Sequence, residues 1–120
     1  SVSKVVFLNF GALLDKAIEV SEKMDFTLID MRFVKPLDHE ILKKYLSKAD
    51  YFVSLEDGSI AGGAGSAVQE FCSMESINVK SILLGIPDRF IEHASREEML
   101  ESAGLSVTKI VDRLKPLLEK

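Results

Sequence analysis

Short apolar runs alternate along this chain with amphipathic stretches, and this alternation is the feature that most restricts the fold. The apolar runs are rich in β-branched and aromatic residues and cover residues 4–10, 26–31, 51–55 and 79–84. The stretches between and after them carry apolar residues at helical spacing. Strands that alternate with helices build βαβ units on a mostly parallel sheet. The sequence therefore predicts an α/β fold whose helices cover the faces of that sheet.

Four of the predicted helices each have one apolar stripe, and we expect that stripe to face the sheet. The stripes consist of Leu13, Leu14, Ala17 and Ile18; of Ile41, Leu42, Tyr45 and Leu46; of Ala64, Ala67, Val68, Phe71 and Cys72; and of Val107, Ile110, Val111 and Leu114.

Local signals predict where several helices begin and end. Asp38 can cap the helix that follows it, and Ser95-Arg96-Glu97-Glu98 has the pattern of a capping box. Gly104 can take the left-handed conformation that ends a helix. Pro116 lacks a backbone donor, so the last helix, beginning near Ser106, should kink or end just before it.

Composition limits the class of protein. A chain of 120 residues with 47% apolar residues suits one domain, residues 1–120, around a single core. With 15 Lys and Arg against 19 Asp and Glu, and no basic block, nucleic acid is a poor partner. No apolar run approaches the roughly 18 residues of a membrane span. The one cysteine, Cys72, permits no internal disulfide, which fits a cytoplasmic protein. The missing initiator Met suggests a piece of a longer chain, although removal of that Met would look the same.

Arg32 is the strongest candidate for ligand binding. It stands at the carboxyl end of the second predicted strand, where open α/β sheets bind ligands, and a guanidinium suits phosphate or carboxylate. Lys35 would add positive potential, and Pro36 keeps the loop extended. From the residues alone, a structural ion pair of Arg32 with Asp30, Asp38 or Glu56 is the preferred interpretation.

Other candidate sites are weaker. Gly62-Gly63-Ala64-Gly65 opens a helix and could hold an anion on free backbone N–H groups, but it matches neither phosphate-binding glycine motif. A tight turn that lets the helix lie close to the sheet is the preferred interpretation. His39 and His93 are interpreted as surface or capping residues, and no metal ligands or catalytic residues are assigned.

Three ordered motifs carry a resemblance that covers nearly the whole chain. They are Asp30-Met31-Arg32-Phe33-Val34-Lys35-Pro36-Leu37-Asp38; Leu55-Glu56-Asp57 with Gly62-Gly63-Ala64-Gly65-Ser66-Ala67-Val68; and Gly85-Ile86-Pro87-Asp88-Arg89-Phe90-Ile91. Together they resemble the C-terminal domain of the 1-deoxy-D-xylulose-5-phosphate synthases, a branch of the transketolase-like thiamine diphosphate enzymes. Asp57-Gly58-Ser59 departs mildly from that family, which usually has a further acidic residue and a less polar loop there.

The resemblance implies a three-layer α/β/α domain with a five-stranded, mostly parallel sheet. It also implies a transferase that condenses pyruvate with D-glyceraldehyde 3-phosphate, with loss of CO₂. The product, 1-deoxy-D-xylulose 5-phosphate, serves isoprenoid (terpenoid), thiamine and pyridoxal phosphate biosynthesis. The full-length enzyme would be a cytoplasmic homodimer that uses thiamine diphosphate and Mg²⁺.

In that family the cofactor and metal ligands lie in preceding domains, so this chain alone is expected to bind neither and to be inactive. The resemblance assigns Arg32 to the phosphate of the acceptor substrate. The glycine turn and Asp88-Arg89-Phe90 would then serve packing and interdomain or dimer contacts.

Two alternatives stay open. The C-terminal domain of a 2-oxo acid dehydrogenase β subunit shares the Asp-x-Arg pattern but transfers to a lipoyl-carrying partner. A noncatalytic assembly or anion-sensing domain would work without any parent enzyme. Two short segments of the sequence favour the synthase over these alternatives. They are Phe33-Val34-Lys35 and Gly62-Gly63-Ala64-Gly65-Ser66.

Overall fold

The structure, a computed structural model, describes residues 4–31, 38–56, 63–85 and 95–118. Strands and helices alternate along these ranges as the sequence pattern predicts. In chain order they are β1 (Val5–Asn9), α1 (Leu14–Met24), β2 (Thr27–Asp30), α2 (His39–Leu46), β3 (Tyr51–Glu56), α3 (Ala64–Met74), β4 (Lys80–Gly85), α4 (Arg96–Ser102) and α5 (Val107–Leu118). No helix in these ranges is both long enough and apolar enough to cross a membrane.

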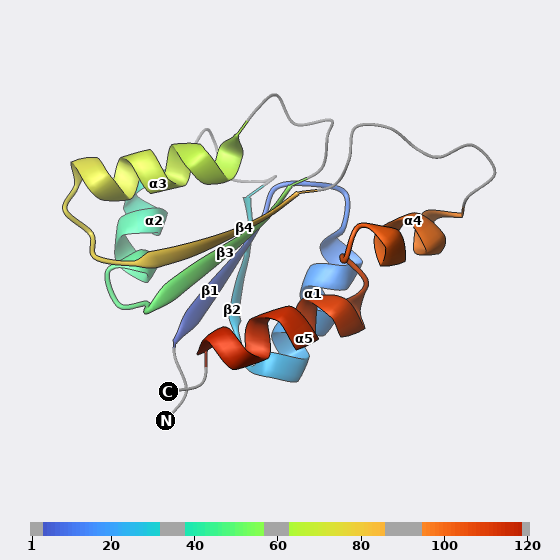
Figure 1. Cartoon of the computed structure of the whole chain (residues 1–120). Coiled ribbons are helices and arrows are strands. Elements are labelled where there is room, and N and C mark those ends of the chain that lie inside the picture. The colour runs from blue at the N-terminus through green and yellow to red at the C-terminus, as the bar shows by residue number, and fades with distance from the viewer. Residues whose placement is uncertain (1–3, 32–37, 57–62, 86–94, 119–120) are drawn as a thin grey trace.

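The strands form one parallel sheet in the order β2-β1-β3-β4. Helices α2 and α3 cover one face, and α1, α4 and α5 cover the other, so the domain has three layers (Figure 1). This confirms the predicted α/β class. The described residues form four strands rather than the expected five. The fifth strand was implied only by the resemblance, and the described chain after β4 carries helical spacing and a helix cap instead.

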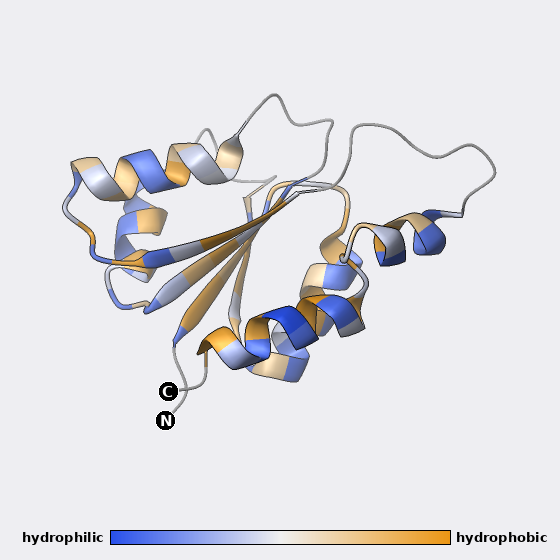
Figure 2. Cartoon of the chain, in the orientation of Figure 1, coloured by the Kyte–Doolittle hydropathy of each residue, from blue (hydrophilic) through white to orange (hydrophobic). Residues whose placement is uncertain are grey.

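Apolar side chains from both sheet faces build two core clusters. In Figure 2 much of the length of the strands is coloured as hydrophobic. Phe7, Val53 and Leu55 pack with α1, α4 and α5, whereas Leu8 and Phe52 pack with α2 and α3. Consecutive residues of β1 therefore serve opposite layers, because side chains alternate across a strand. A central strand that is buried on both faces must be apolar along its whole length.

Two predicted inward residues are exposed instead. Ile18 is 40% exposed and Tyr45 is 37% exposed. In α1 the buried positions are Ala17, Val20 and Ser21, so the buried stripe is turned away from Ile18. Apolar spacing predicted these two helices correctly but did not fix which edge of each apolar stripe faces the sheet.

The predicted caps are confirmed. The Asp38 carboxylate accepts hydrogen bonds from the backbone N–H groups of Glu40 and Ile41. Ser95 and Glu98 form the reciprocal capping box. Gly104 has a φ of 75°, in the left-handed region.

The last helix does not end before Pro116, because α5 runs on to Leu118; of the two expected outcomes, an end at this point is wrong, and a kink stays a prediction. Leu118 is only 1% exposed. Burying a leucine side chain contributes about 1.5–3 kcal/mol, which is comparable with the roughly 3 kcal/mol that a proline inside a helix costs.

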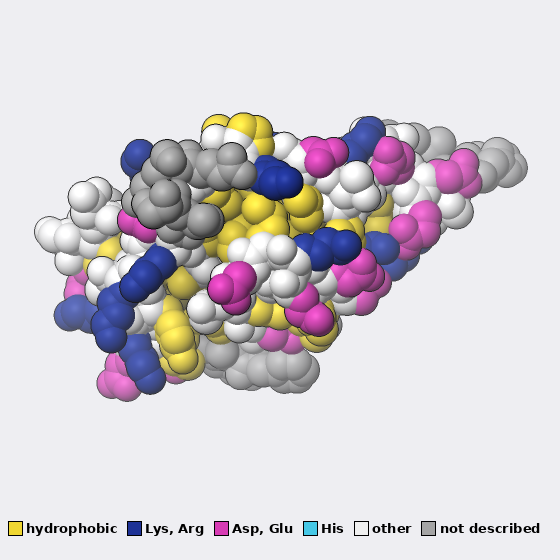
Figure 3. Space-filling model, turned by 90° about the horizontal axis from the view of Figure 1, so that it is seen from below, with side chains coloured by type: hydrophobic (Ala, Val, Ile, Leu, Met, Phe, Trp, Pro, Cys, Tyr) yellow, Lys and Arg dark blue, Asp and Glu magenta, His cyan; other side chains and the backbone are white. Residues whose placement is uncertain are grey.

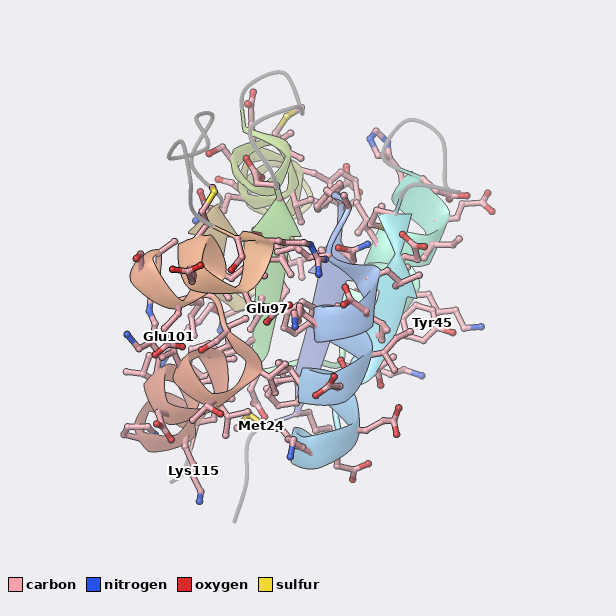
Figure 4. The ribbon with its side chains drawn as sticks, turned by 90° about the vertical axis from the view of Figure 1, so that its right-hand side faces the viewer. Met24, Tyr45, Glu97, Glu101 and Lys115 are labelled. Atoms are coloured by element: carbon pink, nitrogen blue, oxygen red, sulfur yellow. The ribbon has the colours of Figure 1, made fainter. Side chains whose placement is uncertain are left out.

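Ion pairs fasten α4 to α1. The Lys16 ammonium lies 3.0 Å from the Glu97 carboxylate, and the Arg96 guanidinium lies 3.1 Å from that of Asp15. Figure 4 shows Glu97 between α4 and α1. The hydrogen bond from Arg96 lowers the pKa of Asp15 and raises that of the guanidinium itself. These contacts join positions 81 residues apart in the chain.

Candidate functional site

The carboxyl ends of three neighbouring strands carry polar residues. β1 ends at Asn9, β2 at Asp30 and β3 at Glu56. The sheet register places Asn9 beside Asp30 on one side and beside Leu55, the neighbour of Glu56, on the other. Ligands of open α/β sheets bind at this edge. We refer to Asn9, Asp30 and Glu56 as the carboxyl-edge cluster.

Asn9 is fully buried, and both ends of its side-chain amide are hydrogen-bonded. Its Nδ2 donates to Asp30 Oδ1 at 3.2 Å and to the carbonyl of Gly11 at 3.1 Å. Its Oδ1 accepts from the N–H of Gly11 at 3.4 Å. One side chain thus ties the end of β1 to the end of β2 and to the turn that leads into α1.

Glu56 occupies the start of α3. Its Oε2 accepts a hydrogen bond of 2.8 Å from the N–H of Gly65. A helix N-terminus attracts negative charge, and here a carboxylate of the chain itself satisfies one of its free donors. Gly63 caps the helix in the left-handed conformation, with a φ of 89°. The part of the glycine turn that the structure describes therefore binds an internal anion.

Gly65 also brings α3 close to the sheet, as the preferred interpretation of the glycine turn predicted. A Cβ at this position would lie 2.7 Å from Leu83 Cδ2 and closer still to Ser54 Oγ. Ser54 belongs to β3 and Leu83 to β4. The absence of a side chain at Gly65 is thus what allows the helix to approach both strands.

Arg32, the predicted substrate-binding residue, lies outside the described residues, and its role stays a prediction. Lys35, Asp88, Arg89 and His93 lie outside them as well. β2 ends at Asp30, and the described residues that follow it stop at Met31, which is only 4% exposed. The prediction of Arg32 therefore rests on its place in the sequence, two positions beyond the carboxyl-edge residue Asp30.

His39 has a surface role, as expected from the sequence. It is exposed as the first residue of α2, and its ring stacks on Phe71 with ring centroids 4.5 Å apart. The Cys72 thiol is buried, and its burial raises its pKa, so it is a poor nucleophile. Within the described ranges no group of three or more His, Cys, Asp and Glu side chains could hold a metal ion.

A hollow of about 430 Å³ lies at the opposite, amino edge of the sheet. Val5, Val6, Phe26 and Ala49 contribute its apolar lining. Lys44 of α2 and Lys48, just after this helix, also line it. Figure 3, viewed from below, shows apolar side chains in the middle of this face and basic side chains gathered at one corner. The hollow lies at the opposite end of the strands from the carboxyl-edge cluster.

The sequence analysis did not identify Asn9 as a site residue. It considered Glu56 only as a possible ion-pair partner of Arg32. A signal for Asn9 was present, because it interrupts the apolar run Val5-Val6-Phe7-Leu8-Asn9-Phe10. A polar residue inside a buried strand must find hydrogen-bond partners. For Glu56 the partner is the Gly65 N–H, a contact that only the packing of α3 against β3 reveals.

The fold and this edge define a class of protein: the chain belongs to the family of transketolase C-terminal domains, whose profile, "Transketolase, C-terminal domain", matches residues 2–110. A solved structure described as "Split gene transketolase, inactive beta4 tetramer" has the same fold with a TM-score of 0.76 and 27% sequence identity. The match covers 100% of this chain and 41% of that one.

Within this class the chain is similar to one kind of enzyme in particular. Proteins named 1-deoxy-D-xylulose-5-phosphate synthase are 52% identical over 92% of the chain in Buchnera aphidicola subsp. Schizaphis graminum and 48% identical over 89% in Thioalkalivibrio sulfidiphilus. One from Haemophilus influenzae is 43% identical over 98%. These matches confirm the resemblance drawn from the motifs. The chain spans 17–19% of the length of these relatives.

Proposed function

We propose that this chain is the C-terminal domain of a 1-deoxy-D-xylulose-5-phosphate synthase. The full-length protein would condense pyruvate with D-glyceraldehyde 3-phosphate, release CO₂ and form 1-deoxy-D-xylulose 5-phosphate. The observation that carries this proposal is the identity of 43–52% to proteins of that name across 89–98% of the chain. The product would feed isoprenoid, thiamine and pyridoxal phosphate synthesis.

Within that enzyme we propose that Arg32 binds the phosphate of glyceraldehyde 3-phosphate. Two observations support this role: β2 points its end toward the ligand-binding edge, and Arg32 follows that end by two residues. A guanidinium can bind phosphate through two parallel hydrogen bonds. Such charge-assisted contacts are worth about 1.5–3 kcal/mol, or roughly one to two orders of magnitude in acceptor affinity.

The remaining parts of the proposal concern the whole enzyme. Thiamine diphosphate, which would supply the chemistry of decarboxylation, and Mg²⁺ would be held by other domains of the full-length protein. The protein would act as a cytoplasmic homodimer. Calorimetry of the 120-residue chain with thiamine diphosphate and Mg²⁺ tests the cofactor assignment, and measurable binding to this chain would contradict it.

The decisive experiment measures steady-state kinetics of the full-length protein with and without Arg32→Ala. Wild type should form product from pyruvate and glyceraldehyde 3-phosphate. Arg32→Ala should raise the KM for glyceraldehyde 3-phosphate about 10- to 100-fold and change that for pyruvate much less. Arg113→Ala, which removes an exposed arginine of α5, is the matched control and should leave both values unchanged.

Two results would overturn the proposal. A wild-type protein that forms no product with the aldose phosphate, but acylates a lipoyl domain, would belong with the 2-oxo acid dehydrogenases. An Arg32→Ala variant that raises both KM values equally would remove Arg32 from the acceptor phosphate while leaving the reaction assignment intact.

A further inference from the structure

The hollow at the amino ends of β1 and β2, which we call the amino-edge hollow, has an apolar floor that belongs to the core of the domain. Val5 and Val6 are each 5% exposed and Ala49 is 9% exposed, and all three line the hollow. Val5 packs in one core cluster, and Val6 and Ala49 pack in the other. The volume of about 430 Å³ lies within the range of small-molecule sites, roughly 300–1,000 Å³. The hollow is therefore large enough to take a small organic molecule.

The charged residues of the amino-edge hollow are mostly basic. Lys4, Lys44 and Lys48 line it together with a single carboxylate, that of Asp25. The whole chain has 15 basic residues against 19 acidic ones, so this excess of positive charge is local. Among the residues that the structure describes, no ion pair neutralises any of these three lysines. The hollow therefore attracts anions, because a cleft lined by one sign of charge concentrates ions of the other.

Two of these lysines are positioned by α2 and the turn that continues it. Lys44 and Lys48 are four positions apart, and the Lys48 N–H donates to the carbonyl of Tyr45 at 3.4 Å. Residues at this spacing lie on the same side of a helical turn. The Lys44 ammonium lies 5.4 Å from the centroid of the Tyr45 ring, and Tyr45 also lines the hollow. Positive charge and an aromatic ring thus lie side by side next to the apolar floor.

We propose that the amino-edge hollow is a binding site for a small organic anion with an aromatic or other apolar body. The apolar body would lie on Val5, Val6 and Ala49, where its removal from water favours binding. The carboxylate, sulfonate or phosphate group of the ligand would lie beside Lys44 and Lys48. Because this site is at the opposite end of the strands from the carboxyl-edge cluster, the inference does not depend on the proposed reaction.

The probe for this site is 8-anilinonaphthalene-1-sulfonate, an aromatic anion whose fluorescence rises when its rings leave water. Fluorescence titrations of the 120-residue chain and of the full-length protein measure its Kd, and amide chemical shifts of the 120-residue chain locate it. The largest shifts should occur at Val5, Val6, Phe26, Thr27 and Ala49, in a spectrum that otherwise stays native. N-phenyl-1-naphthylamine, which has the same rings without the sulfonate, should bind about tenfold more weakly.

Lysine variants test the charge of the site. Lys44→Gln and Lys48→Gln change exposed side chains and should each raise the Kd of the sulfonate about threefold, and together about tenfold. Lys43→Gln is the matched control. Lys43 lies on the same helix but is not part of the lining, and its ammonium already lies 3.5 Å from the Glu75 carboxylate. This variant should leave the Kd unchanged.

Several results would overturn the site. They are a lack of saturable binding, largest shifts outside the hollow, and a Kd that responds to Lys43→Gln as strongly as to Lys44→Gln and Lys48→Gln. Two more would assign the hollow to another occupant and so overturn it as well. Shifts of its amides that depend on protein concentration without probe would identify a second copy of the chain. Binding by the 120-residue chain but not by the full-length protein would show that another segment of that protein covers the hollow.

Discussion

Replacing Gly65 with alanine should destabilise the domain, although alanine is the better helix former. The new Cβ would stand 2.7 Å from Leu83 Cδ2, closer to Ser54 Oγ, and 3.3 Å from Ser54 Cβ. Leu83 is 36% exposed and can rotate away. Ser54 cannot move its Cβ, because β3 is held on both sides by β1 and β4. The contact with Ser54 therefore decides the outcome.

The size of the effect follows from two opposing contributions. Alanine in place of glycine in a helix gains about 0.5–1 kcal/mol. Overpacking of a close contact costs about 1–3 kcal/mol. The position is in the first turn of α3, where the propensity gain is at its smallest. We expect a net loss of about 1–2 kcal/mol in the free energy of unfolding.

Urea unfolding of the chain, followed by circular dichroism, measures this loss. Gly85→Ala is the control, since a Cβ there would meet nothing within 4 Å, and it should leave the midpoint almost unchanged. Ser54→Ala should reduce the penalty of Gly65→Ala, because it removes the closer of the two Ser54 contacts, with a coupling free energy of about 0.5–1 kcal/mol. A Gly65→Ala variant as stable as wild type would refute the close approach of α3 to the sheet.

Three further outcomes follow from the described contacts. Ser95→Ala removes the hydroxyl of the capping box and should cost about 1 kcal/mol in thermal unfolding, and an unchanged melting temperature would contradict the cap. The pKa of Asp15 lies below its ordinary value of 3.8, chiefly because of the hydrogen bond from Arg96, so the stabilisation is complete above that value and is lost as the pH falls through the lower folded pKa. Asp15→Asn should therefore flatten the acid limb of the stability profile below about pH 4, and a limb identical to that of wild type would contradict the pair. Cys72 is buried with a raised pKa, so Ellman's reagent should label it only as fast as the chain opens, and immediate labelling of the native chain would contradict its burial.

Much of the fold could be predicted from the sequence because its signals are local. Asp38, Ser95 and Gly104 cap or end helices through bonds or backbone angles set within a few residues, and each prediction is confirmed. Predictions that depend on more distant partners were less accurate. Ile18 was placed inward by spacing alone, and Pro116 was given too much weight because the burial of Leu118 is a tertiary effect.

In the candidate site, too, local sequence signals could be predicted, whereas contacts between distant residues could not. Arg32 was identified from its motif and its position after a strand, and its role stays a prediction. Asn9 and Glu56 acquired roles only from the structure, through contacts with Asp30 and Gly65. A polar residue inside an apolar strand indicated that Asn9 needs a hydrogen-bond partner. The partner, Asp30, is 21 residues away in the chain and could not be predicted from the residues around Asn9.

The sequence by itself determined the secondary structure, the parallel α/β class and the family. Hydrophobic periodicity, helix caps and short motifs depend only on residues that are close together in the chain. The tertiary structure alone decided the strand order β2-β1-β3-β4, the carboxyl-edge cluster and the ion pairs that join α1 to α4. The physical reason is that parallel strands pair only through crossover connections, so contacts between their ends depend on how distant segments pack rather than on local preference.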